Sequence, residues 1–180
     1  LGDVYKRQAD DGEILTRHGG TFKGYFKDEK STREVIDEEG WLHTGDVGEI
    51  TERGSLIITD RKKDIIMTSG GKNVSPSEIE NKIKASPFIK DALVVGDRRK
   101  FLSCLVAIEF ETVSNWALRK KIPFTTYRDL TEKSEVRELV SKEIIRANEE
   151  TSSLQVRKFE LIPKELDHED GELTATQKIK

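Results

Sequence analysis

The sequence contains few of the features that mark secreted or membrane-embedded proteins. It has a single cysteine, Cys104, so no internal disulfide can form, which indicates a reducing, cytoplasmic compartment. No apolar run approaches the ~20 residues that span a bilayer, and the start lacks the apolar core of a signal peptide. Because Cys104 stands inside the apolar run 101–108, the sequence predicts a small buried side chain rather than a nucleophile.

The sequence also lacks an excess of either charge. Its 180 residues include 31 Lys and Arg against 34 Asp and Glu, a net charge of −3, which argues against a nucleic-acid-binding surface. Charged residues make up 36% and hydrophobic residues 34%, so a core can form beneath a strongly ionic surface. The length suits one ordinary domain or two small ones.

Histidine is scarce and scattered. His18, His43 and His168 have no partner Cys or His at a metal-ligand spacing, so no metal site is predicted. His43 titrates near neutral pH in principle, but it stands beside Trp41 in a strand-like segment. We expect a packed or surface histidine there rather than a catalytic one.

The most informative stretch covers residues 58–80. A β-branched run is followed by a run of charges, a second apolar run, a Gly-Gly pair and the start of a helix. Charged side chains between two strand-like segments stay solvated whichever way the flanking bodies rotate. The pattern therefore predicts an exposed connector between two bodies.

The helix after the connector has a strong start signal. Ser75 and Glu78 form a capping box, and Pro76 at the first helical position loses no hydrogen bond. The helix is expected to end before Pro87. The upstream pair Gly70-Gly71 favours a tight β-to-α turn, but it also suits a place where another molecule passes close to the backbone. The Walker phosphate-loop pattern is absent.

The remaining patterns predict short strands followed by a mixed region. The expected strands are 12–17, 41–51, 55–59, 88–96, 101–110 and 156–162, and the expected helices are 31–36, 112–121 and 134–150. Segments 41–51 and 55–59 read as a hairpin with Arg53-Gly54 in its turn. Residues 1–8 do not join the pattern. Part of this segment can be encoded by a sequencing adapter, so we expect a non-native leader and set it apart from the fold.

Two segments carry a resemblance to a known family. Residues 60–66, Asp-Arg-Lys-Lys-Asp-Ile-Ile, and residues 69–80 resemble the hinge and the opening of the C-terminal domain in AMP-forming acyl-CoA synthetases, of the adenylate-forming superfamily. Residues 24–26 and 40–46 are similar to the last subdomain of that family's N-terminal body. The resemblance implies an α+β / α/β fold. It consists of a partial β-rich subdomain, 9–60, a hinge, 61–64, and a small α/β lid domain with a short sheet and flanking helices, 65–180, truncated at its end.

The resemblance also implies roles for residues of a nucleotide site. Asp46 takes the place of the carboxylate that binds the ribose hydroxyls of ATP or acyl-AMP, and Arg61 is its companion. A carboxylate at a strand start can accept two hydrogen bonds from a ribose diol. Lys63 falls at the hinge position. Lys178 falls where the adenylation lysine bridges the substrate carboxylate and the α-phosphate, although Thr176-Gln177 replaces the Ser-Gly that many members carry before it.

A second implied region would contact CoA. By resemblance, Gly70 and Gly71 line the passage of the pantetheine arm. The basic cluster Arg98, Arg99 and Lys100 is either a solvated turn or a contact for the CoA phosphates.

The function implied is that of a long-chain fatty-acid–CoA ligase, of which this chain is a C-terminal fragment. Such an enzyme uses fatty acid, ATP with Mg²⁺ and CoA, and the complete protein could associate peripherally with a membrane. Two alternatives stay open. One is another adenylate-forming ligase, for aryl, short-chain or amino-acid substrates; the other is a stand-alone, non-catalytic module that binds CoA or a protein partner. We expect the isolated fragment to be inactive, because it contains neither the phosphate loop nor the acyl tunnel.

Overall fold

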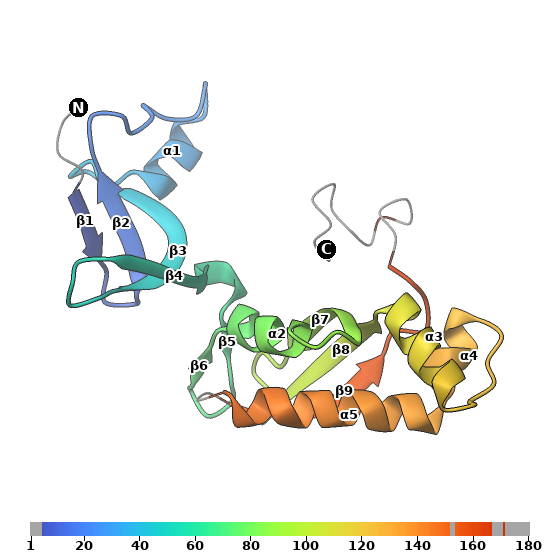
Figure 1. Cartoon of the computed structure of the whole chain (residues 1–180). Coiled ribbons are helices and arrows are strands. Elements are labelled where there is room, and N and C mark those ends of the chain that lie inside the picture. The colour runs from blue at the N-terminus through green and yellow to red at the C-terminus, as the bar shows by residue number, and fades with distance from the viewer. Residues whose placement is uncertain (1–4, 152–153, 167–170, 172–180) are drawn as a thin grey trace. The chain divides into compact units, whose positions relative to one another are not determined.

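The chain divides into two units at the end of the charged connector (Figure 1). The computed structural model describes residues 5–151, 154–166 and 171. Unit 1 is Leu1–Ile65 and unit 2 is Ile66–Lys180. The boundary falls one residue beyond the predicted hinge 61–64, and each unit has its own sheet and its own buried side chains.

Unit 1 is built on a four-stranded antiparallel sheet. Its strands are β1 (Tyr5–Gln8), β2 (Glu13–Arg17), β3 (Leu42–Ile50) and β4 (Leu56–Arg61), paired in that order. A short helix, α1 (Glu29–Val35), is capped by Asp28, whose carboxylate accepts from the amide of Ser31. The 3₁₀ turn η1 (Lys62–Asp64) follows β4 directly. The strand at 12–17 and the hairpin around Arg53-Gly54 are confirmed, with Gly54 in the left-handed conformation.

The core of unit 1 is small and is closed by arginines. Ile14, Leu15 and Trp41 are buried, and the guanidinium carbons of Arg7 and Arg17 lie 4.5 and 4.7 Å from the centre of the Trp41 ring. Stacking of this kind is attractive because the ring face carries partial negative charge. The long side chains thus cover apolar surface that the sheet alone leaves open.

Residues Tyr5–Gln8 take part in this fold, although the sequence pattern sets residues 1–8 apart. They form β1, paired with β2 from Tyr5–Arg17 to Gln8–Ile14, and the side-chain amide of Gln8 donates to the carbonyl of Gly48 at 2.7 Å. The edge of β2 offers unpaired backbone groups that any extended segment can satisfy. The non-native origin of the segment stays a prediction.

Unit 2 contains a two-stranded and a three-stranded sheet with helices around them. Strands β5 (Ile66–Met67) and β6 (Asn73–Val74) form the small sheet, and β7 (Ile89–Val95), β8 (Leu102–Ile108) and β9 (Val156–Leu161) form the larger one in that order. β7 and β8 form the expected antiparallel hairpin, whereas β9 runs parallel to β8. Parallel pairing requires a long crossover, and α3 (Phe110–Arg119), α4 (Tyr127–Glu132) and α5 (Ser134–Glu149) provide it.

The predicted helix after the connector is α2 (Pro76–Lys84). The hydroxyl of Ser75 accepts from the amide of Glu78 at 3.4 Å, Pro76 occupies the first turn, and the helix ends at Ala85. Ile79 and Ile83 are each 1% exposed, so the apolar stripe of α2 is buried. The helix start and the stripe are both confirmed.

One core joins all the elements of unit 2. Leu102 and Val106 of β8 and Val136 and Val140 of α5 have no measurable exposure. The apolar stripe of α5 is therefore buried within the domain, which is the simpler of the two explanations for an amphipathic helix. In Figure 1, α5 runs along unit 2 from the α3–α4 end to the β5–β6 end. Within the described residues, no helix combines the length and the apolar character needed to cross a membrane.

Deleting core volume should destabilise unit 2. We expect Leu102→Ala to lower the free energy of unfolding by about 2–5 kcal/mol, because the side chain is fully buried and leaves a cavity. The control, Leu118→Ala on α3, removes the same atoms from a residue that is 64% exposed and should change stability by less than about 0.5 kcal/mol. Chemical denaturation measures both. Equal effects of the two substitutions would contradict this core.

The cysteine provides an independent probe of the same core. Cys104 is 1% exposed, and burial raises the pKa of its thiol to about 12. The protonated, inaccessible thiol should therefore react with a disulfide reagent at pH 8 only when the chain opens. Because the sequence has one cysteine, the absorbance of the released thiolate reports this site alone. Labelling of the native chain as fast as that of the chain in denaturant would contradict its burial.

Candidate functional site

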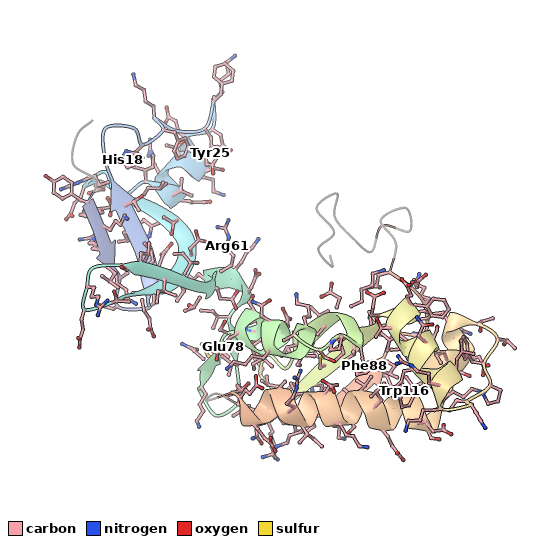
Figure 2. All side chains as sticks on the ribbon, viewed as in Figure 1. His18, Tyr25, Arg61, Glu78, Phe88 and Trp116 are labelled. Atoms are coloured by element: carbon pink, nitrogen blue, oxygen red, sulfur yellow. The ribbon has the colours of Figure 1, made fainter. Side chains whose placement is uncertain are left out.

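The end of the β3–β4 pair brings together the two residues predicted to bind a nucleotide. Asp46 and Arg61 are partners in the antiparallel register, and Arg61 Nε lies 3.0 Å from Asp46 Oδ1. Figure 2 labels Arg61, which is the last residue of β4. The two side chains are 33% and 56% exposed for Asp46 and Arg61, so a ligand can reach them.

The backbone around Asp46 is held by hydrogen bonds to both neighbouring strands, β2 and β4. Arg61 Nη1 donates to the carbonyl of Thr44 at 3.1 Å, and the amide of Asp46 donates to the hydroxyl of Thr44. That hydroxyl in turn donates to the carbonyl of Ile14 at 2.7 Å. Gly45 has φ +70°, a left-handed conformation that favours glycine. A carboxylate has about four acceptor positions, so the pair with Arg61 leaves Asp46 able to bind a diol.

A buried carboxylate, Glu13, contacts this part of β3 from strand β2. Glu13 is 4% exposed, and it accepts from the amide of Gly45 at 2.9 Å and from Lys62 Nζ at 2.9 Å. His43 Nδ1 lies 3.1 Å from the same carboxylate, and Lys62 Nζ also lies 2.6 Å from Asp11 Oδ2. One carboxylate thus connects strand β2, the part of strand β3 just before Asp46 and the first residue of η1.

The charges of this cluster reinforce one another. The hydrogen bond from Lys62 holds the pKa of Asp11 below its ordinary value. Burial alone would raise the pKa of Glu13, but bonds from Lys62, His43 and Gly45 outweigh it and leave the pKa lowered. Asp11 and Glu13 raise the pKa of Lys62. The stabilisation from the carboxylates is present above their unfolded pKa, about pH 4, and is lost as the pH falls through the lowered values; that from Lys62 is lost only at strongly alkaline pH.

The sequence analysis did not identify Glu13 or Lys62 as site residues. Neither residue carries a local signal that distinguishes it in the sequence. Ile14 and Leu15 have opposite strand parity and are both buried, so alternation along β2 does not single out Glu13. Lys62 stands inside a charge run that reads as uniformly solvated, and only the tertiary structure distinguishes it from its neighbours.

The described histidines have structural partners. His43 contacts Glu13 as described, and its Nε2 lies 3.8 Å from Asp37 Oδ2. His18 Nδ1 accepts from the amide of Gly20 in the turn after β2. His168 lies outside the described residues. In the parts of the chain that the structure describes, no group of three or more His, Cys, Asp or Glu side chains is placed to hold a metal ion.

In unit 2, the Gly70-Gly71 pair lies at the tip of the β5–β6 hairpin. The amide of Thr68 donates to the carbonyl of Lys72 at 3.0 Å, and the amide of Gly71 donates to the carbonyl of Thr68 at 2.9 Å. Gly71 has φ +75°, so the turn itself requires a glycine there. Gly70 has no such requirement. A Cβ at Gly70 would meet only the Thr68 hydroxyl, at 4.0 Å.

The turn 97–100 docks directly on this hairpin. The amide of Arg98 donates to the carbonyl of Met67 at 2.7 Å, and the amide of Met67 donates to Asp97 Oδ1 at 3.1 Å. The amide of Ser69 donates to the carbonyl of Arg99 at 3.0 Å. The structure therefore places side by side two segments, separated by about thirty residues, that the resemblance relates to CoA, the second of them only as an alternative to a solvated turn.

The basic side chains of this turn face solvent. Arg98 adopts φ +56°, a strained conformation for a residue with a side chain, and its side chain is 91% exposed. An open groove beside the turn is lined by Val95, Gly96, Asp97, Arg99, Lys100, Phe101 and Ser103. The Lys158 ammonium lies 5.5 Å from the centre of the Phe101 ring. Basic and aromatic groups next to an accessible backbone turn suit an anionic ligand with a flexible chain.

The remaining predicted residues lie apart from these clusters. Lys63 is exposed in η1, next to the clamped Lys62. Lys178 lies outside the described residues, so its predicted role stays a prediction.

Comparison with known proteins shows the family. A family model described as the AMP-binding enzyme C-terminal domain matches residues 63–179. The long-chain-fatty-acid–CoA ligase FadD15 of Mycobacterium tuberculosis is 40% identical over 176 residues, which cover 97% of this chain and 29% of that protein. A long-chain-fatty-acid–CoA ligase of Homo sapiens is 35% identical, over 94% of this chain and 26% of its own length. The chain thus spans less than a third of the length of these relatives.

Solved structures show the same fold at lower identity. The adenylation domain of a carboxylate reductase from Mycobacterium chelonae matches with a TM-score of 0.77 at 20% identity, covering 99% of this chain and 28% of that one. The O-succinylbenzoate coenzyme A synthetase of Bacillus subtilis, in complex with ATP and magnesium, matches with a TM-score of 0.63 at 21% identity, over 98% of this chain and 32% of its own. The α+β / α/β fold class is confirmed. The chain belongs to the AMP-binding enzymes, in the adenylate-forming acyl-CoA ligase family, and carries their C-terminal domain.

Proposed function

We propose that this chain is the C-terminal part of a long-chain fatty-acid–CoA ligase, in which Asp46 and Arg61 bind the nucleotide and unit 2 acts as a lid. The enzyme would convert fatty acid, ATP and CoA to acyl-CoA, AMP and pyrophosphate through an acyl-adenylate. The observation that carries the proposal is the 3.0 Å pair of Asp46 and Arg61, because two distant motifs of the resemblance meet at one accessible point.

The nucleotide part of the proposal rests on the chemistry of that pair. Asp46 accepts hydrogen bonds from the ribose hydroxyls, and Arg61 neutralises and orients Asp46. A fatty carboxylate is a weak nucleophile, so the first step depends mainly on positioning and on neutralising charge at the α-phosphate. Lys178 is the proposed source of that positive charge. Mg²⁺ would accompany ATP, and no step is assigned through it.

The CoA part rests on the two docked turns of unit 2. A pantetheine arm needs backbone that it can approach closely, and Gly70 provides this without being required by the turn itself. Arg98, Arg99 and Lys100 lie on the adjoining turn, where they can contact the phosphates of the same ligand. Rotation about Lys63 would withdraw Lys178 after adenylation and bring the Gly70 turn to the thioester-forming position.

The choice of a fatty acid rests on the names of the most similar proteins. Relatives at 35–40% identity over nearly the whole chain are called long-chain-fatty-acid–CoA ligases. None of the proposed site residues contacts the acyl chain, so other adenylate-forming ligases stay the alternative. We further propose a cytoplasmic enzyme, with peripheral membrane contact made by the complete protein.

The Gly70 turn offers a steric test of CoA passage. Gly70→Ala should fold normally, because its φ is not left-handed and the new Cβ meets no atom closer than 4.0 Å. In the longer enzyme that we propose contains this chain, it should slow thioester formation from preformed acyl-adenylate by at least about tenfold, since one methyl group would obstruct the arm. The control is Gly19→Ala, a glycine with no atom within 4 Å of its Cβ and no left-handed φ. An unchanged thioester rate would remove Gly70 from the CoA path.

Lys178 should give the opposite pattern. Lys178→Ala is expected to block adenylation, measured as pyrophosphate exchange, by at least about a hundredfold, because it removes the charge at the α-phosphate. Thioester formation from preformed acyl-adenylate should stay near the wild-type rate. Equal loss of both half-reactions would contradict the division of labour between Lys178 and Gly70. Absence of pyrophosphate exchange with any fatty acid in the wild-type enzyme would contradict the proposed function itself.

A further inference from the structure

The cluster of Asp11, Glu13 and Lys62 is not assigned by the proposed roles of Asp46, Arg61 and Lys63. The cluster is nevertheless directly connected to these residues. Lys62 follows Arg61 directly and precedes the predicted pivot, Lys63, while Glu13 contacts the residue before Asp46.

Lys62 is fixed to unit 1 more firmly than an ordinary surface lysine. Its ammonium lies 2.6 Å from Asp11 Oδ2 and 2.9 Å from Glu13 Oε2, and the Glu13 side chain is 5% exposed. An exposed ion pair contributes little, but a pair with a buried carboxylate is costly to break because the remaining charge has no solvent around it. The chain up to Lys62 is therefore held to strand β2.

The two carboxylate oxygens of Glu13 bind different parts of unit 1. Oε1 accepts from the amide of Gly45, and Oε2 binds Lys62 and contacts His43. Gly45 precedes the proposed ribose-binding residue, Asp46. A displacement of the Glu13 carboxylate would therefore move both the ribose contact and the start of the hinge.

We propose that Glu13 is a positioning residue that fixes the root of the hinge at Lys62 and, through Gly45, sets the position of Asp46. The proposal rests on the proposed function, because the hinge and the ribose contact are parts of it. The pivot then begins at Lys63, since Lys62 is bound to Asp11 and Glu13 and the preceding strand β4 is paired with β3. Asp11 is the second carboxylate that binds Lys62. The amide of Gly45 donates to Glu13 and not to Asp11.

Three substitutions separate the two tasks of Glu13. Glu13→Ala removes both. Glu13→Gln keeps an oxygen for the Gly45 amide but loses the charge that binds Lys62, and Lys62→Met removes only the hinge arm while keeping the length of the side chain. The matched control is Lys133→Met, which breaks a lysine–carboxylate pair of 2.8 Å with Asp129 in unit 2.

The first measurement is amide hydrogen exchange in this chain, which needs no activity. We expect exchange at residues 62–64 to accelerate at least about tenfold in Glu13→Ala, Glu13→Gln and Lys62→Met, and to stay unchanged in Lys133→Met. Exchange at Gly45 should accelerate only in Glu13→Ala. Unchanged exchange at residues 62–64 in Lys62→Met would overturn the clamp, whatever the function of the protein.

The second measurement is made in the longer enzyme. Both half-reactions should slow about tenfold to a hundredfold in all three variants, because a displaced lid misplaces the groups it carries. The dissociation constant for AMP should rise, by about tenfold, only in Glu13→Ala. An equal rise in all three variants would overturn the separation of tasks. If the wild type shows no ligase activity, the proposed function fails while the exchange result still tests the clamp. Should Glu13→Ala fail to fold, Glu13→Gln and Lys62→Met still decide the hinge arm.

Discussion

Unit 1 depends on the ionised carboxylate of Glu13, buried beneath the sheet. Removing a carboxylate from water is expensive unless charged and polar donors replace the solvent. Lys62, the Gly45 amide and His43 are placed to do so, and they come from η1 and from two positions of β3. The cost of leaving Glu13 unpaired therefore binds two segments, β3 and η1, to β2. The small apolar core of this unit could not fix their positions alone, because among residues 5–65 only three large apolar side chains, Ile14, Leu15 and Trp41, are buried.

Unit 2 holds its site segments in place through a different interaction. Its core is extensive and apolar, and the site elements are attached to that core through backbone hydrogen bonds. The turn 97–100 extends the β7–β8 hairpin, and the bonds of Asp97, Arg98 and Arg99 to residues 67–69 hold the β5–β6 tip against it. The strained φ of Arg98 is tolerated because its amide reaches the carbonyl of Met67. The Gly70 turn is therefore attached to the larger sheet, as the proposed rotation of unit 2 would require.

The sequence predicted those features that local chemistry determines. The helix start at Ser75 and Pro76, the stripe of α2 and the antiparallel hairpin of β7 and β8 each follow from a short pattern, and each is confirmed. Asp46 and Arg61 were predicted only through resemblance, but their pairing follows from the register of a hairpin that the sequence did predict. Glu13, Lys62 and Asp97 could not be singled out, because their partners are distant in the sequence. Glu13 lies 49 residues from Lys62 and 32 residues from Gly45. Asp97 lies 30 residues from Met67. Pairing at such separations depends on tertiary structure.

Independent observations restrict the proposed pivot to a few residues. The ammonium of Lys62 is hydrogen-bonded to Glu13 of unit 1. The match to the family model begins at Lys63, and the boundary between the two units follows Ile65. A rotation that begins after Lys62 and is complete at Ile66 leaves three residues to absorb the change in dihedral angles. Short hinges of this kind need a firm attachment on each side, since a loose root would spread the rotation along the chain. On the unit 2 side, Ile66 is buried and paired with Val74. On the unit 1 side, the attachment is the salt bridge of Lys62 with Glu13, so the buried charge that organises unit 1 would also define where the proposed rotation of unit 2 begins.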